Sequence, residues 1–364
     1  MAEPLLSPYL HWAKTRQPAA IDLAGSNLLH CDLDDLPGAR DAVELAARND
    51  EGFIPLREAI AAHYGVTPNR VVTGTGCAGA TFLAIGAIAR AGDDVLVERP
   101  AYDPLMGACR LLGINVRRFD RRADEGYAVD PDAVRAQLTP RTRAVILTSP
   151  HNPSGVGLDA DRLEAVGREA ARVGAVIIVD EVYLDGANAC GDARRPLIPA
   201  ARLDGPFIST SSLTKSYGLA GLRCGWAIAP PEIAERIQRT RDVVDNVCSV
   251  PSERLGALAF QQLAALTART RRILGGNLER AREFFASRAK LVLPGPPSSS
   301  IVFARLDDAS KTRGFVQRLL DGYGVAVAPG HFFESPDHFR VSVAGDPEVL
   351  AEGLRRLGAA LDAE

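Results

Sequence analysis

Residues 208–226 read Ile-Ser-Thr-Ser-Ser-Leu-Thr-Lys-Ser-Tyr-Gly-Leu-Ala-Gly-Leu-Arg-Cys-Gly-Trp, and the interpretation of the whole chain starts from the lysine in this stretch, Lys215. A short apolar segment ends here, a cluster of hydroxyl side chains leads into Lys215, and Arg223 follows after a glycine-rich turn. The chain has only four lysines among its 42 Lys and Arg residues, and the other three lie in polar contexts. A lysine framed by small residues at the end of a strand can lose its proton on burial and attack carbonyl carbons. Taken alone, such a residue is more often a solvated lysine in a Ser/Thr loop, so its surroundings must decide.

Around this stretch the sequence alternates short apolar segments with helix-like segments. The expected strands are 71–73, 94–98, 114–119, 144–148, 175–180, 206–209 and 226–229. The expected helices before Lys215 are one within 52–64 and those at 77–90, 104–112, 131–137 and 159–173. Short apolar strands separated by helices of this length predict a parallel sheet that is covered by helices on both faces.

The C-terminal part of the chain predicts a second, smaller lobe. Helices are expected at 231–244 and from 252 to about 288, the second bridging the two lobes, followed by strands and helices at 301–305, 311–323, 325–328, 339–344 and 347–361. The expected fold class is α/β, with a large domain built on a mostly parallel sheet and a smaller α+β domain. We expect residues 1–45 to form an N-terminal arm and part of the small domain, 46–250 the large domain, and 251–364 the C-terminal small domain.

Composition excludes several classes of protein. A chain of 364 residues with 46% hydrophobic and 24% charged residues is long enough for two lobes with a large core. Its net charge of −3 offers no basic surface for nucleic acid and no polybasic patch for a membrane. The first residues lack the features of a secretory signal. Six scattered cysteines without Cys-x-x-Cys spacing indicate reduced thiols in a cytoplasm, and no His/Cys cluster supports a metal site.

The glycine-rich segment Gly74-Thr-Gly76-Cys-Ala-Gly79 has two interpretations. It matches G-x-G-x-x-G between a strand and a helix, and Glu98 ends the next strand, as in a dinucleotide-binding fingerprint. The alternative is a different phosphate group, because any helix N-terminus with close backbone N–H groups attracts an anion. The motif alone does not decide between a nicotinamide cofactor and another phosphate.

Three further polar stretches follow predicted parallel strands, where open α/β sheets place their ligands. They are Pro100-Ala-Tyr102-Asp-Pro, Thr148-Ser-Pro-His-Asn152-Pro-Ser-Gly155 and Asp180-Glu-Val-Tyr183. Each has an ordinary explanation by itself: a turn aromatic, a loop, a helix cap or a packing tyrosine. Their common position just after a strand, all upstream of Lys215, favours one shared site.

Together these residues resemble the pyridoxal-phosphate-dependent aminotransferases of class I/II, the aspartate aminotransferase superfamily of fold type I. The resemblance extends from about Gly52 to Arg340. It rests on Asn-Pro-x-Gly at Asn152, Asp-x-x-Tyr at Asp180, and Ser-x-x-Lys at Ser212 with an arginine eight residues after the lysine. It implies pyridoxal 5′-phosphate as cofactor and the fold described above.

The resemblance implies a catalytic role for three residues. Lys215 would form the Schiff base with the cofactor and, once displaced by substrate, act as the base. Asp180 would keep the pyridine nitrogen protonated, as the cofactor's role as an electron sink requires. Tyr183, with Asn152, would hydrogen-bond the phenolic oxygen of the cofactor.

Further residues would bind the cofactor and the substrate. Tyr102 would stack on the cofactor ring, and Asn152 would also contact the substrate. Arg340 would hold the substrate carboxylate with its two-pronged guanidinium. The phosphate would be held by Ser212, Arg223, Gly76 and the backbone N–H groups of Cys77 and Ala78. The peptide bond between Asn152 and Pro153 is a candidate for the cis form.

The chain departs from the family pattern in two places. Ala78 stands where many relatives have Ser or Thr, and the region before Gly52 lacks the tyrosine that in many relatives reaches the phosphate in the neighbouring subunit. Residues 1–45 match the family loosely, and the segment 21–27 is expected to be a short strand with no assigned contact.

The leading functional hypothesis is an enzyme that transfers an amino group between an L-amino acid and a 2-oxo acid by a ping-pong mechanism. The alternative on the same fold is another reaction at Cα or Cβ, such as that of a lyase, decarboxylase or cyclase of secondary metabolism. Remote alternatives are a regulatory domain without turnover and a nicotinamide-dependent dehydrogenase. The resemblance also implies a homodimer, with small molecules as its other partners.

Overall fold

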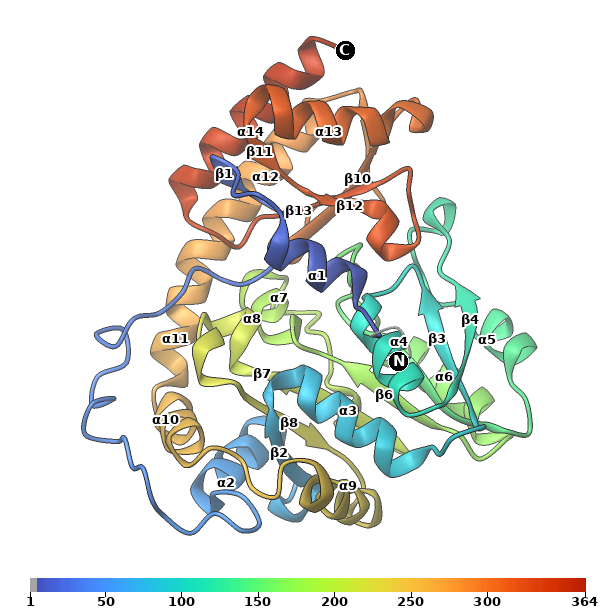
Figure 1. The fold of residues 1–364 in the computed structure, drawn as a ribbon, viewed down its shortest axis with the longest axis vertical. Coiled ribbons are helices and arrows are strands. Elements are labelled where there is room, and N and C mark those ends of the chain that lie inside the picture. The colour runs from blue at the N-terminus through green and yellow to red at the C-terminus, as the bar shows by residue number, and fades with distance from the viewer. Residues whose placement is uncertain (1–4) are drawn as a thin grey trace.

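The computed structural model describes residues 5–364, and its largest element is a seven-stranded sheet (Figure 1). The strands lie in the order β2–β8–β7–β6–β5–β3–β4. Their bounds are β2 (Val71–Thr75), β3 (Asp94–Arg99), β4 (Asn115–Asp120), β5 (Thr142–Thr148), β6 (Val176–Asp180), β7 (Phe207–Ser212) and β8 (Cys224–Ile228). The expected α/β class is confirmed.

The register of this sheet brings several strand ends to one edge. The pairs β3–β4, β3–β5, β5–β6 and β6–β7 are parallel, whereas β8 runs antiparallel to both β2 and β7. Strand β2 therefore has the same direction as the parallel strands. The carboxyl ends of β2, β3, β5, β6 and β7 consequently share one edge, and the segments after them are placed to meet there.

Helices cover both faces of the sheet, as the apolar strands predict. Alternate residues of one strand belong to different cores, since Ile178 lies in one and Ile177 in the other. One face packs against α3 (Gly76–Ile88), α4 (Asp103–Leu111) and α9 (Pro231–Val244). The other face packs against α2 (Ile54–Tyr64), α5 (Pro131–Gln137), α6 (Ala160–Ala171) and α10 (Val250–Gln261). We call this assembly the large lobe.

A second, smaller sheet forms the upper part of the molecule in Figure 1. It is antiparallel, in the order β12–β13–β10–β9, with β9 (Leu291–Val292), β10 (Ile301–Leu306), β12 (Ala328–Pro329) and β13 (Phe339–Ser342). Helices α12 (Gly276–Ala286), α13 (Thr312–Tyr323) and α14 (Pro347–Asp362) share its core. We call this part the small lobe.

The prediction of one long helix from 252 to about 288 is wrong in detail, because the structure interrupts this helix twice. Helix α10 ends before Gln262, whose backbone leaves the helical conformation at φ −107°. Helix α11 (Leu263–Thr270) then passes through one π-helical turn at Arg271–Gly275 into α12. Leu266 belongs to a core of the large lobe and Leu278 to that of the small lobe, so these consecutive helices do connect the lobes. The division of the chain into domains at residues 45 and 250 stays a prediction.

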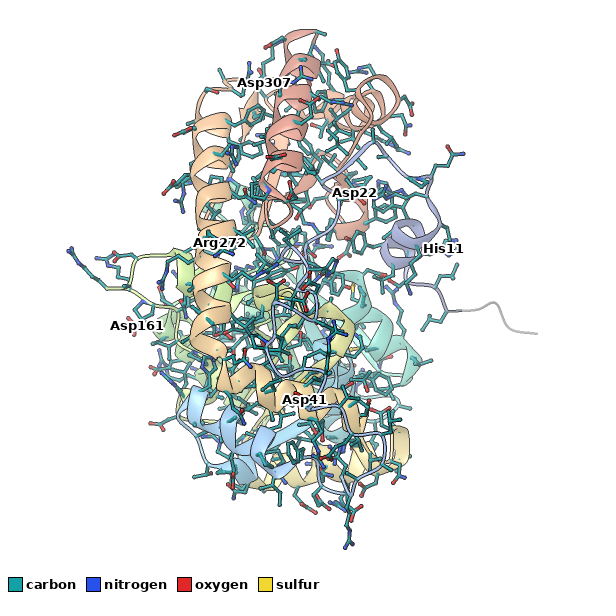
Figure 2. All side chains as sticks on the ribbon, turned by 90° about the vertical axis from the view of Figure 1, so that its left-hand side faces the viewer. His11, Asp22, Asp41, Asp161, Arg272 and Asp307 are labelled. Carbon is teal, nitrogen blue, oxygen red and sulfur yellow. The ribbon has the colours of Figure 1, made fainter. Side chains whose placement is uncertain are left out.

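The N-terminal arm contacts both lobes. Helix α1 (Pro8–Thr15), which the sequence did not predict, lies against Tyr102 at the start of α4. Strand β1 is shorter than expected, at Ile21–Asp22, and pairs in parallel with β11 (Val325–Ala326). Figure 2 shows the arm from the side, with Asp22 at the level of the small lobe and Asp41 at that of the large lobe. No helix within residues 5–364 has the length and apolar character needed to cross a bilayer.

Strand β8 and the start of α3 touch at two glycines, Gly225 and Gly76, and this contact generates a prediction. A Cβ atom on Gly225 would overlap the backbone of Gly76 at the start of α3. Gly225→Ala should therefore lower the free energy of unfolding by about 1–3 kcal/mol or more, because the obstructing atoms are backbone. Gly221→Ala is the matched control, since nothing lies within 4 Å of its Cβ position. Urea denaturation that gives equal losses for both variants would contradict this close approach.

Candidate active site

Lys215 lies on a short helix at the shared edge of the large sheet. Helix α8 (Leu213–Tyr217) follows β7 directly, and the Ser212 hydroxyl caps it by accepting a hydrogen bond from the Thr214 N–H at 3.3 Å. The Lys215 amine donates to Ser26 Oγ at 2.8 Å and to Asn27 Oδ1 at 2.6 Å. Burial, with Arg340 nearby, lowers the pKa of Lys215 to about 7. A large fraction of its amine is therefore neutral near pH 7 and able to accept a proton.

Asp180 ends β6 and is buried beside the start of α3. Its Oδ1 accepts hydrogen bonds from the Cys77 thiol at 3.3 Å and from the Val182 N–H at 3.1 Å. Burial raises the pKa of Asp180, while these donors and the charge of Lys215 act in the opposite direction. A buried carboxylate whose hydrogen-bond donors are both uncharged is suited to a cationic group on a ligand.

Asn152, Tyr183 and Arg340 form one buried chain of hydrogen bonds. Arg340, on β13 of the small lobe, donates to Asn152 Oδ1 at 2.7 Å, and Asn152 Nδ2 lies 3.5 Å from the Tyr183 hydroxyl. Arg340 also donates to the Tyr9 hydroxyl at 2.6 Å and to the Ala24 carbonyl at 3.0 Å. Burial raises the pKa of Tyr183 to about 12. The chain therefore connects the arm, the small lobe and the edge of the large sheet.

The start of helix α3 and Arg223 lie against each other. Gly76 has φ +71°, and a Cβ atom there would overlap the guanidinium of Arg223. The Gly76 N–H donates to the Arg223 carbonyl at 2.7 Å, which ties the end of β2 to the turn before β8. Cys77 and Ala78 follow in the first turn of α3. A positive side chain beside a helix N-terminus is suited to bind a phosphate.

Tyr102 lies in an aromatic cluster that the sequence did not predict. It immediately precedes α4, and its ring lies 6.0 Å from that of Tyr9, centroid to centroid. Trp12, Phe332 and Phe333 complete the cluster around Tyr9. The arm and the small lobe thus place aromatic side chains next to Arg340. Tyr9, Ser26 and Asn27 are the site residues that sequence reasoning missed, because they lie in the part of the chain with the least family pattern.

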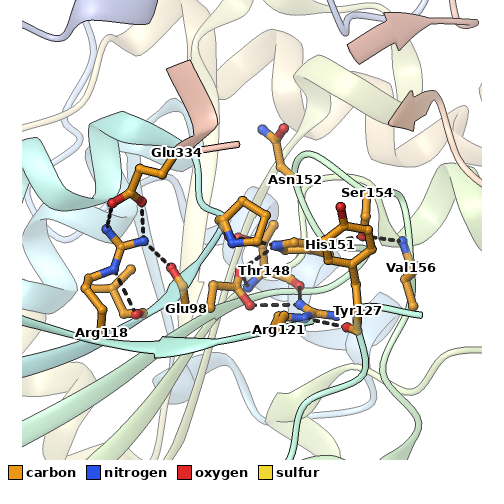
Figure 3. Close-up of polar contacts among 12 residues, drawn as sticks. Glu98, Arg118, Arg121, Tyr127, Thr148, His151, Asn152, Ser154, Val156 and Glu334 are labelled. Atoms are coloured by element: carbon orange, nitrogen blue, oxygen red, sulfur yellow. Dashed lines mark hydrogen bonds and ion pairs between the residues drawn. The ribbon is translucent and has the colours of Figure 1, made fainter. Parts of the chain in front are cut away.

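A buried ion pair supports the loop that carries Asn152 (Figure 3). Glu98 and Arg121 are fully buried and lie 2.8 Å apart, between Oε2 and Nη1. Glu98 Oε1 accepts from the Thr148 N–H at 2.7 Å, and Arg121 donates to the Thr148 carbonyl at 3.3 Å. Because the Glu98 carboxylate is buried in this ion pair, it is not free to bind a ribose. The dinucleotide hypothesis needs an acidic residue at this position for that purpose, so the structure argues against it.

His151, next to Asn152, is held within the same region. Its Nε2 lies 2.9 Å from the Pro100 carbonyl and its Nδ1 2.7 Å from Ser154 Oγ. Since a carbonyl only accepts, Nε2 carries the proton. Burial lowers the pKa of His151 well below its ordinary range, so the ring is neutral and serves as a support. The expected cis bond before Pro153 is wrong: the cis peptide bonds precede Pro100 and Pro150.

The site residues predicted from the sequence thus gather at one edge of the large sheet, and their chemistry fits pyridoxal 5′-phosphate. The lysine amine can react with an aldehyde. The buried Asp180 suits a protonated ring nitrogen, and the helix N-terminus beside Arg223 suits the phosphate. The individual role of each residue stays a prediction.

Comparison with known proteins agrees with this assignment. A model of the family described as aminotransferase class I and II matches residues 49–357. Capreomycidine synthase of Streptomyces vinaceus is 32% identical over 88% of this chain and 82% of its own. The structure of N-succinyldiaminopimelate aminotransferase from Mycobacterium tuberculosis superposes with a TM-score of 0.87 at 27% identity, covering 99% of this chain and all of that one. The PLP-dependent cyclase OrfR superposes with a TM-score of 0.85 at 26% identity, covering 100% and 98% of the two chains.

The Glu98–Arg121 pair generates a prediction about stability. Glu98→Gln leaves a buried guanidinium without its counter-charge and should lower the free energy of unfolding by about 3–5 kcal/mol. Asp120→Asn is the control, because Asp120 forms an exposed ion pair with Arg99, with 2.5 Å between Oδ1 and Nε. This substitution should lower the free energy of unfolding by less than about 1 kcal/mol. Urea denaturation of both variants is the measurement. A loss for Glu98→Gln no larger than that for Asp120→Asn would contradict the supporting role.

Proposed function

Because the chain belongs to the class I and II aminotransferases, which are enzymes that depend on pyridoxal 5′-phosphate, we propose that it moves an amino group between an L-amino acid and a 2-oxo acid. The amino group would be stored on the cofactor between two half-reactions. Amino acid and oxo acid would therefore use the same site in turn.

The environment of Arg340 is the observation that carries this proposal. Arg340 is fully buried, and within residues 5–364 its hydrogen-bond acceptors are neutral: an amide oxygen, a hydroxyl and two backbone carbonyls. Its Nε has no partner in the same part of the chain. A buried charge is costly unless an opposite charge reaches it. The carboxylate that amino acids and 2-oxo acids share would supply that charge in the bidentate form that guanidinium prefers.

Lys215 would move the proton in each half-reaction. When bound, pyridoxal phosphate takes up the electrons left at Cα after a bond to that carbon breaks. The neutral Lys215 amine would take the proton from the substrate Cα and release it again within the site. Its pKa of about 7 is suited to both steps near neutral pH. Arg340 would orient the substrate so that its Cα–H bond faces this amine.

Asp180, Tyr183 and Asn152 would hold the cofactor. Asp180 would keep a proton on the ring nitrogen by hydrogen bonding and charge. Tyr183, whose pKa of about 12 keeps its hydroxyl protonated, would donate to the phenolic oxygen. Asn152 touches both Tyr183 and Arg340 and would thus align cofactor and carboxylate. Ser212, Arg223 and the first turn of α3 would hold the phosphate, and Tyr102 would cover the ring.

A second candidate is a reaction at Cβ that ends in elimination or ring closure. It is favoured by the similarity to capreomycidine synthase and to the cyclase OrfR. The same residues would bind the cofactor and remove the Cα proton in that reaction. The two candidates differ in whether the amino group of the first substrate would stay on the cofactor when the first product leaves.

Two finer proposals concern the working state of the protein. We propose that it acts in the cytoplasm, since its six cysteines are free in the structure. We also propose a homodimer, for which exposed aliphatic side chains at Leu45, Ile54 and Val243 offer apolar contact surface. Both stay predictions.

The first test of function uses protein loaded with pyridoxal phosphate and a panel of L-amino acids without an oxo acid. A transaminase should release about one oxo acid per chain and stop, and an added 2-oxo acid should restart it. A lyase or cyclase would turn over repeatedly without an acceptor, which would contradict the proposal. Lys215→Ala is the control and should lower the rate by several orders of magnitude, on the order of 10³ or more.

The second test concerns the carboxylate. Arg340→Lys keeps a positive charge but loses the paired hydrogen bonds, so kcat/KM for amino acids should fall about tenfold or more, mainly through KM. Initial rates for several amino acids are the measurement. Arg305→Lys, on the neighbouring strand β10, is the matched control and should leave kcat/KM unchanged. An unchanged kcat/KM in Arg340→Lys would reject the assignment.

A further inference from the structure

We propose that Ser26 and Asn27 of the N-terminal arm are positioning residues that hold the Lys215 amine whenever it is free of the cofactor. They would bind both hydrogens of the neutral amine and leave its lone pair available to take the Cα proton. This inference rests on the proposed function for its purpose, since it concerns the base of that reaction. The segment 21–27 thereby gains a role that the sequence analysis left unassigned.

The geometry matches the hydrogen-bonding capacity of a neutral amine. Such an amine has two N–H groups and one lone pair, and Lys215 donates to Ser26 Oγ at 2.8 Å and to Asn27 Oδ1 at 2.6 Å. An amide oxygen can only accept, so the contact with Asn27 fixes the direction of that bond. With both hydrogens bound, the lone pair occupies the remaining tetrahedral position. The base is then oriented before the substrate proton arrives.

The arm that carries these acceptors is fixed by other contacts. The Leu23 N–H donates to the Ala326 carbonyl at 2.8 Å, and the Leu29 N–H donates to the Ala344 carbonyl at 2.8 Å. Between them, Arg340 donates to the carbonyls of Ala24 and Gly25. The small lobe therefore holds the backbone on both sides of Ser26 and Asn27. Their side chains are not needed to anchor the arm and are free to hold the amine.

The neutrality of both acceptors is chemically important. The charged groups that influence Lys215 are the cations Arg340 and Arg223 and the carboxylate of Asp180, together with the Cys77 thiol. Neutral oxygens orient the amine without adding a negative charge. A carboxylate in the place of Asn27 would favour the ammonium form, which has no lone pair and cannot act as a base. Asn27 thus combines orientation with an amine that remains reactive.

Ser26 also connects the amine to the predicted cofactor site. Burial raises the pKa of Tyr183 to about 12, and the nearby Ser26 side chain acts against this rise. Ser26 is itself buried, at 7% exposure. The hydroxyl therefore lies between the base and the tyrosine predicted to contact the cofactor. Its position would keep the released amine close to the carbon from which it must take a proton.

The first test follows the free amine directly in holoenzyme loaded with pyridoxamine 5′-phosphate, in which Lys215 carries no covalent bond. Pulse acetylation with acetic anhydride over a range of pH, read on the Lys215 peptide by mass spectrometry, gives the midpoint of its titration. Lys14, Lys290 and Lys311 serve as references in the same chain. The midpoint of the wild-type protein is the reference against which the variants are compared.

The variants should shift this midpoint in opposite directions. Asn27→Asp adds a negative charge and should raise it by about one pH unit or more. The double variant Ser26→Ala/Asn27→Ala removes acceptors that bond an ammonium more strongly than an amine, and should lower it by about one unit. Ser7→Ala is the matched control, because the Ser7 hydroxyl lies on the same arm but donates to Asp103. An identical Lys215 midpoint in all four proteins would overturn the proposal.

The second test measures exchange of the substrate Cα hydrogen in deuterium oxide by NMR, with the pyridoxal phosphate holoenzyme. Exchange should fall about tenfold near pH 7 in Asn27→Asp and recover at higher pH, whereas loss of structure alone would not recover. The double variant should lose exchange at every pH, with little change in the KM of the amino acid. Exchange equal to wild type in both would overturn the proposal. Exchange requires no acceptor, so these results stand even where the transamination test fails.

Discussion

The buried guanidinium of Arg340, which pairs with no carboxylate within residues 5–364, is the constraint on which the arrangement of the site depends. Its neutral acceptors come from the N-terminal arm and from the loop after β5, while Arg340 itself lies on the small lobe. Each acceptor compensates part of the loss of hydration, and none supplies a negative charge. Three distant segments are thereby drawn together around one cation. The proposed carboxylate substrate would bring a negative charge to this position.

Most of the fold was predictable because its signals are local. The central strands β5 and β6 are apolar on both faces, and helices α5 and α9 have the bounds that the sequence indicates. Lys215, Asp180 and Asn152 were predictable as neighbours because parallel strands bring their carboxyl ends to one edge. The interruption of the helix at Gln262 was not predictable, because no Gly or Pro lies next to this residue in the sequence.

The contacts that the N-terminal arm makes with the site could not be predicted from the sequence. Asn27 and Lys215 are 188 residues apart, and β1 comprises two residues, too few for a periodic pattern. Tyr9 could have been suspected only from its place among the few aromatic residues. For Glu98, by contrast, a local signal was misleading. Its spacing from Gly79 matches a dinucleotide-binding motif, yet its carboxylate forms a buried ion pair with Arg121, which lies on another segment. Local spacing in the sequence therefore indicates candidate site residues, whereas their actual partners depend on contacts between distant segments.

Every role proposed for the site depends on Lys215 being the residue joined to pyridoxal phosphate, and reductive labelling identifies that residue. The loaded protein is reduced with borohydride, digested, and searched for the lysine that carries the phosphopyridoxyl group. With four lysines in the chain, the assignment is unambiguous. We expect the label on the peptide containing Lys215 and on no other. A label on Lys14, Lys290 or Lys311, or on none, would contradict it.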